Sequence, residues 1–132
     1  MADSKSDAEV LAVKDESREL PIPSSWRPVF RQIVSAFVQR DYRLSAGVPG
    51  VAPVTADTAA HIEKYIEGYG EALVELPEEA WDSSVCIWMG ERWDALVDLW
   101  TRAEGRSDLV LSARIVESDA GFEFHIYMVY VP

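Results

Sequence analysis

Apolar and polar residues alternate through the last third of the chain. Val85, Ile87 and Met89 take every second position, and the same pattern continues in three later stretches. Successive side chains of a strand point to opposite faces, so this period of two is typical of antiparallel strands buried on one side. The pattern predicts four strands, over residues 84–89, 93–101, 108–117 and 122–131.

Two earlier stretches repeat apolar residues at helical spacing instead. After the N-cap type Ser24, the apolar residues from Trp26 to Phe37 share one side and arginines take the other. A second helix should begin after Thr55 and end at Gly70, a residue type that commonly stops helices. The apolar sides of both helices are expected to pack on the sheet.

The apolar pattern also predicts how the strands pair. We expect Met89 to face Trp93 rather than Arg92, because this pairing keeps the apolar residues of both strands on one face. The same argument places Leu111 opposite Met128 in the last hairpin. A one-residue slip would turn every side chain to the other face.

The reverse face of this predicted sheet carries aromatic and charged residues together. Its candidate partner-binding residues are Trp88, Asp94, Asp98, Trp100, Arg114, His125 and Tyr127, with Cys86, Leu96 and Val110 between them. Trp88, Asp94, Arg114 and His125 should form one row across the four strands. Such a mixture is typical of protein interfaces, since Trp, Tyr and Arg dominate their energetics. A solvated face with a weak cross-strand ion pair is the alternative.

These elements define an α+β fold in which two main helices pack on one face of a four-stranded antiparallel meander. Residues 24–132 form a single domain, as the chain length of 132 residues also indicates. Residues 1–23 are mostly Ser, Asp, Glu and Lys, and we expect them to be a disordered acidic tail. The loop 43–54 is either a binding loop or a plain connector.

The net charge of −11 makes nucleic acid an improbable partner and a basic protein a possible one. The single Cys86 excludes an internal disulfide and a cysteine-rich metal site, and its place within a strand indicates an inert thiol. No apolar run is long enough to span a membrane, and residues 1–23 do not resemble a signal peptide. We therefore expect a cytoplasmic protein.

Catalytic motifs are missing from the sequence. It contains no phosphate-binding glycine loop, no HExxH, no GxSxG and no cluster of Cys and His. Asp98 and His125 could act as a base and its orienting group, but no nucleophile or metal pattern accompanies them. The sequence therefore predicts neither a metal nor a cofactor, and an enzymatic role is left open but disfavoured.

Several segments resemble a family of short bacterial proteins of unknown function. They are Ile33–Val38, Gly47–Val51, Tyr69–Gly70, Trp93, Leu96–Leu99, Ser107–Leu109 and Val129–Pro132. The resemblance covers residues 26–132 and implies no catalytic residue. The order of helices and strands is more loosely similar to the NTF2-like fold, which hosts enzymes, ligand binders and scaffolds.

Two functions follow from these observations. The first is a non-enzymatic interaction protein, antitoxin-like or immunity-like, which binds a basic protein or a second copy of itself. The second is an NTF2-like domain that binds or transforms a small molecule in a pocket between helices and sheet.

Overall fold

The structure is a computed structural model that describes residues 9–132. Three helices are present in this part of the chain, after a short 3-10 turn, η1, at Ser24–Trp26. They are α1 (Arg27–Val38), α2 (Ala56–Tyr69) and α3 (Ala80–Ser83). The strands are β1 (Leu20–Pro21), β2 (Val85–Trp88), β3 (Trp93–Thr101), β4 (Gly105–Ser118) and β5 (Gly121–Tyr130).

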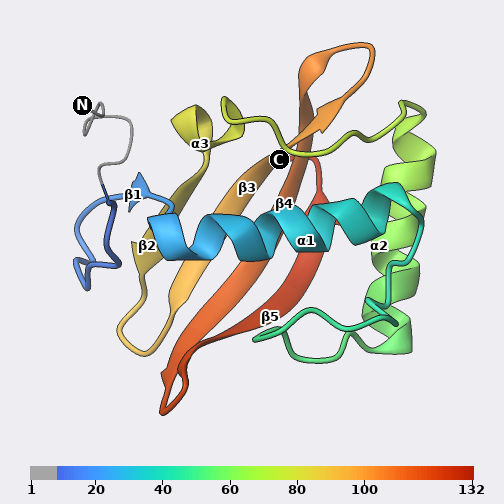
Figure 1. The fold of residues 1–132 in the computed structure, drawn as a ribbon. Coiled ribbons are helices and arrows are strands. Elements are labelled where there is room, and N and C mark those ends of the chain that lie inside the picture. Colours follow the sequence, from blue (N-terminus) through green and yellow to red (C-terminus); the bar gives the residue numbers. More distant parts are fainter. Residues whose placement is uncertain (1–8) are drawn as a thin grey trace, which may run out of the picture.

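The five strands form one antiparallel meander in the order β1-β2-β3-β4-β5. The α+β class and the antiparallel sheet are confirmed, but the sheet has five strands rather than the four predicted. Figure 1 shows α1 crossing one face of the sheet, whereas α2 stands beside β5. Both main helices therefore pack on the sheet as expected, α1 across its face and α2 along β5, where α2 adds Ile62 and Ile66 to the core.

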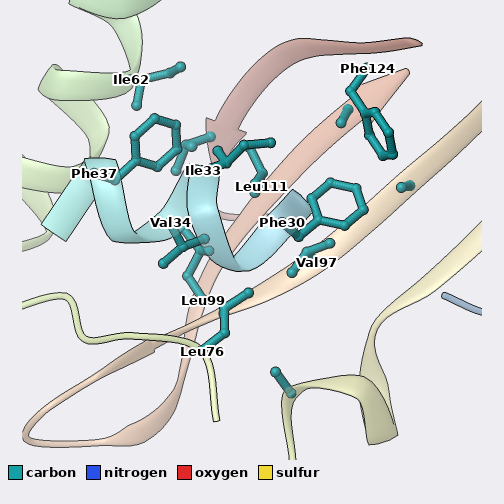
Figure 2. Close-up of a cluster of buried hydrophobic side chains, with 14 of the residues drawn as sticks. Phe30, Ile33, Val34, Phe37, Ile62, Leu76, Val97, Leu99, Leu111 and Phe124 are labelled. Carbon is teal, nitrogen blue, oxygen red and sulfur yellow. The ribbon is translucent and has the colours of Figure 1, made fainter. Parts of the chain in front are cut away.

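The core lies between α1 and the sheet (Figure 2). Phe30, Ile33 and Val34 of α1 are fully buried, and Figure 2 shows them in one cluster with Leu99 of β3 and Leu111 of β4. Each fully buried side chain of this kind stabilises the fold by about 1.5–3 kcal/mol. This filled layer fixes which face of the sheet is covered.

The predicted pairing of β2 with β3 is wrong by one residue. Trp88 pairs with Trp93, and the Met89 backbone N–H donates to the Arg92 carbonyl oxygen at 2.7 Å. The hairpin closes through a tight turn at Gly90, whose φ of 97° suits glycine. The turn therefore overrides the apolar pattern, and Met89 becomes 49% exposed.

A second predicted pairing, in the last hairpin, is wrong by one residue because β5 contains a bulge. The register shifts between Ser112 and Ala113, so Leu111 pairs with Val129 rather than Met128. The bulge inserts one residue into β5 and reverses the facing of the residues that follow it. Val129 is consequently fully buried, whereas Met128 is only half-buried.

Residues 10–22 pack against the sheet, which differs from the disordered tail predicted for residues 1–23. Ile22 is fully buried, and Leu20 pairs with Cys86 at the edge of β2. The indole N–H of Trp93 donates to the Val13 carbonyl oxygen at 3.0 Å. Backbone pairing and one large buried side chain supply contacts that composition does not reveal. Residues 1–8, the rest of the predicted tail, lie outside the described residues.

The loop 43–54 covers the opposite edge of the sheet. The Phe124 N–H donates to the Gly50 carbonyl oxygen, and the Ala52 N–H donates to the Phe124 carbonyl oxygen, both at 2.8 Å. Val51 forms a parallel bridge with Phe124 between these two bonds. Paired edges offer few free backbone groups to another strand. The chain thus pairs part of each edge of its own sheet.

Candidate functional site

The face of the sheet opposite α1, here called the outer face, is the candidate site. Its strand residues include Val85, Ile87, Asp94, Leu96, Asp98, Trp100, Arg106, Val110, Ser112, Arg114, Val116, Glu123, His125, Tyr127, Met128 and Tyr130. On β3 these residues are half-exposed, while every residue between them is buried. The alternation shows that one face of β3 is sealed and the other is not.

One row of paired residues crosses the outer face. Ile87 pairs with Asp94, Asp94 with Arg114, and Arg114 with His125. The predicted row is confirmed for its last three members. Trp88 was expected in place of Ile87, and the register of the β2–β3 hairpin moves Trp88 to the α1 side. The row therefore begins with an aliphatic residue.

The charged groups of this row already have partners within the chain. The Arg92 guanidinium donates to the Asp94 carboxylate at 2.9 Å, and both side chains are about one third exposed. The Arg114 guanidinium lies 3.9 Å from the centroid of the Tyr127 ring, a cation–π contact. Paired charges cost less to remove from water than isolated charges, so a partner can cover this row.

His125 and Asp98 do not form the base and orienting group considered from the sequence. His125 lies 2.9 Å from the Glu123 carboxylate, and Asp98 accepts a hydrogen bond from the Ser83 hydroxyl. The backbone N–H of Asp98 donates to Ser84 Oγ at 3.0 Å. The two candidate residues are therefore held by separate neighbours on β5 and near α3.

Apolar side chains surround the charged row. Val110 is only 7% exposed and yet is not part of the cluster beneath α1. It pairs with Asp98 and Tyr130, and Leu96 pairs with Val85 and with Ser112. Half-exposed Leu, Val, Met and Tyr side chains together with charges are typical of a protein-binding surface.

Strand alternation places six of the seven predicted site residues on one face, and one of them, Trp100, also packs against the buried core. The six are Asp94, Asp98, Trp100, Arg114, His125 and Tyr127. Trp88 is the exception. Sequence reasoning missed Val85, Ile87, Met128 and Tyr130, which it assigned to the core. The glycine turn after Met89 was a signal for the first two, whereas the sequence carries no comparable signal for the bulge.

Acidic residues that could attract a basic partner are partly engaged by α1. Arg31 bonds to Glu78, and the Arg40 guanidinium lies 3.5 Å from Glu67. The Tyr42 hydroxyl donates to the same Glu67 carboxylate at 2.9 Å. Burial, reinforced by that carboxylate, raises the pKa of Tyr42 to about 12. Arg31 of α1 and Arg40 just after it thus partly neutralise Glu78 and Glu67.

The part of the chain that the structure describes holds neither a cluster of metal ligands nor an activated cysteine. Among the described residues, no cluster of three or more His, Cys, Asp or Glu side chains could hold a metal ion. Cys86 is a buried free thiol, and burial raises its pKa to about 11. Since the thiolate is the nucleophile, this environment makes Cys86 inert.

Two surface cavities lie away from the outer face. One, of about 460 Å³, lies between the C-terminal ends of α1 and α2 and includes Tyr42, Glu67 and Arg102 in its lining. The other, of about 380 Å³, is a groove between α2 and the end of β5, lined in part by Tyr65 and Val131. Neither separates α1 from the sheet.

Comparison with protein families now identifies the domain. A family model matches residues 34–132. The chain belongs to this family, DUF7668, a domain of unknown function. Membership in a family of unknown function is therefore confirmed. A search of curated proteins and a search of solved structures each found no match. Within residues 9–132, no helix has the length and apolar character needed to cross a membrane.

Proposed function

We propose that this DUF7668 chain is a non-enzymatic protein-interaction domain whose outer face binds the partner. One observation carries the proposal. The outer face combines half-exposed apolar side chains with charged groups that already have partners, while α1 seals only the opposite face. The apolar side chains would supply binding energy, and the charged row would set orientation.

The partly paired edges of the sheet support this choice of surface. Leu20 and Pro21 pair with β2, and Val51 bridges to Phe124 of β5. A partner that adds a strand needs a free edge, whereas a partner that covers a face does not. The outer face is accordingly the favoured route to a protein partner.

The geometry does not favour the small-molecule function. An NTF2-like binder would need a pocket between helices and sheet, and apolar side chains such as Phe30, Phe37 and Leu111 fill that layer (Figure 2). The NTF2-like likeness and the bacterial origin remain inferences from resemblance. A cytoplasmic location is also part of our proposal and rests on the sequence alone.

A photo-reactive amino acid tests the proposed surface in cells that express the full chain. It replaces half-exposed Ser112 at the centre of the outer face, or exposed Ala60 on α2 as the matched control. The proposal expects Ser112 to give a covalent protein adduct, identified by mass spectrometry, that the added substitution Leu96→Lys removes. Adducts of equal yield from both positions, or none from Ser112, would contradict it.

A further inference from the structure

We infer that the partner of the outer face is a second copy of this chain, packed face to face. The inference rests on the proposed function and names its partner. The two copies are related by a twofold axis that lies midway between their facing outer faces. The axis runs parallel to β3 and β4 and passes over the gap between these two strands. An interface of this kind uses the same surface of both copies.

The positions of Asp94 and Arg114 point to this axis. They are paired residues on β3 and β4, the two strands at the centre of the outer face. Rotation about the axis exchanges these strands and leaves each row at its own level. Asp94 then faces the partner's Arg114, and Arg114 faces the partner's Asp94. The symmetry therefore forms two opposite-charge contacts at once.

The neighbouring row is complementary under the same rotation. Val85, Leu96, Ser112 and Met128 occupy this row on β2, β3, β4 and β5. Leu96 would face the partner's Ser112, whose small side chain leaves space for it. Val85 would face the partner's Met128. Large side chains thus meet small or flexible ones, which favours close packing.

Charge balance favours a second copy over a basic protein. The chain carries a net charge of −11, so two copies repel each other over most of their surfaces. On the outer face, however, Asp94, Asp98 and Glu123 are nearly balanced by Arg106 and Arg114, and Arg92 of the adjoining turn bonds to Asp94. A basic partner would be attracted to a strongly acidic surface, whereas a second copy requires a balanced surface.

The size of the outer face sets the expected affinity of the dimer. Four strands about 4.8 Å apart and about seven residues long give a footprint of roughly 20 by 23 Å. This area lies at the low end of specific protein interfaces. We therefore expect a reversible dimer that forms in the micromolar concentration range.

Two charge reversals test the axis. Asp94→Arg places an arginine opposite the partner's Arg114 in both contacts, and Arg114→Asp places two carboxylates together. Each variant alone should dimerise at least about tenfold more weakly than wild type, because like charges meet. An equimolar mixture of the two should form a heterodimer, since opposite charges then meet in both contacts.

Sedimentation velocity measures wild type, each variant and the mixture, while circular dichroism confirms that each variant is folded. The neutral pair Asp94→Asn and Arg114→Gln serves as a control, because mixing restores only one of the two opposite-charge contacts and should strengthen dimerisation less than mixing the charge reversals does. Recovery of a dimer in the mixture would support the inference, because an effect within one chain cannot be repaired by another chain.

Two results would overturn the inference. One is a mixture that stays monomeric while wild type dimerises, and the other is a wild type that stays monomeric at high concentration. In either case, a Ser112 cross-link to a different protein would still support the proposed function. If Ser112 gave no cross-link at all, the proposed function would fail as well.

Discussion

Trp88 packs against Trp93 across the β2–β3 hairpin, with ring centroids 4.5 Å apart and the ring planes inclined at 58°. Both residues lie on the face that α1 covers, and Trp93 is almost fully buried. Lys14 of the N-terminal segment lies over the Trp88 ring, 5.1 Å from its centroid. The pair therefore links the hairpin, the core and the N-terminal segment, and it fixes the register on which the outer face depends.

This register predicts unequal costs for neighbouring substitutions. Trp88→Ala should lower the free energy of unfolding by about 2–3 kcal/mol, since a half-buried aromatic contact is lost. Met89→Ala should change it by less than about 0.5 kcal/mol, because Met89 is half-exposed at the turn. Urea unfolding of both variants measures the difference. A larger loss for Met89→Ala would indicate the alternative register.

The two faces of β5 give a second contrast. Phe124 is 3% exposed and packs edge-on against Trp26 and Phe30, so Phe124→Ala should cost about 3–5 kcal/mol. Tyr127 is 45% exposed, and Tyr127→Ala should cost clearly less. Thermal and urea unfolding report both values at a concentration where the chain is monomeric. Equal losses would mean that both faces of β5 are buried.

The N-terminal segment should contribute to stability. Ile22→Ala removes a fully buried side chain and should cost about 2–4 kcal/mol. Leu11 is 66% exposed in the same segment, and Leu11→Ala should have an effect within about 0.5 kcal/mol. Chemical denaturation of the two variants separates these cases. A negligible effect of Ile22→Ala would contradict this packing and would favour the disordered tail expected from composition.

Cys86 should make stability depend on pH in the alkaline range. Its folded-state pKa is raised from 9.0 to about 11 by burial, so the unfolded chain loses the thiol proton first. The resulting stabilisation is complete below pH 9 and is lost as the pH rises toward 11. Unfolding free energies of wild type and Cys86→Ala between pH 8 and about 10 test this. Parallel curves for the two proteins would contradict it.

Periodicity predicted the main elements of the fold well. The strand expected over 93–101 matches β3, and Thr55 caps α2 by accepting a hydrogen bond from the Thr58 N–H at 3.2 Å. Long stretches with a clear period carry redundant information, so single exceptions do not hide them. The opposite charges of Asp94 and Arg114 on adjacent strands were predicted for the same reason.

Local backbone features explain what the sequence did not predict. The turn at Gly90 and the bulge near Tyr127 each shift the register by one residue, and neither changes the apolar period within a strand. The strand β1 has only two residues, Leu20 and Pro21, which is too short for any periodicity. These features moved Trp88 off the outer face and added four apolar residues to it.

Sedimentation velocity of the wild-type chain over a wide concentration range tests the central claim most directly. The measurement includes Leu96→Lys on the outer face and the charge-matched control Ala60→Lys on α2. Our account predicts that wild type and Ala60→Lys form dimers at high concentration, while folded Leu96→Lys stays monomeric. A wild type that remains monomeric throughout, or a Leu96→Lys variant that dimerises like wild type, would contradict it.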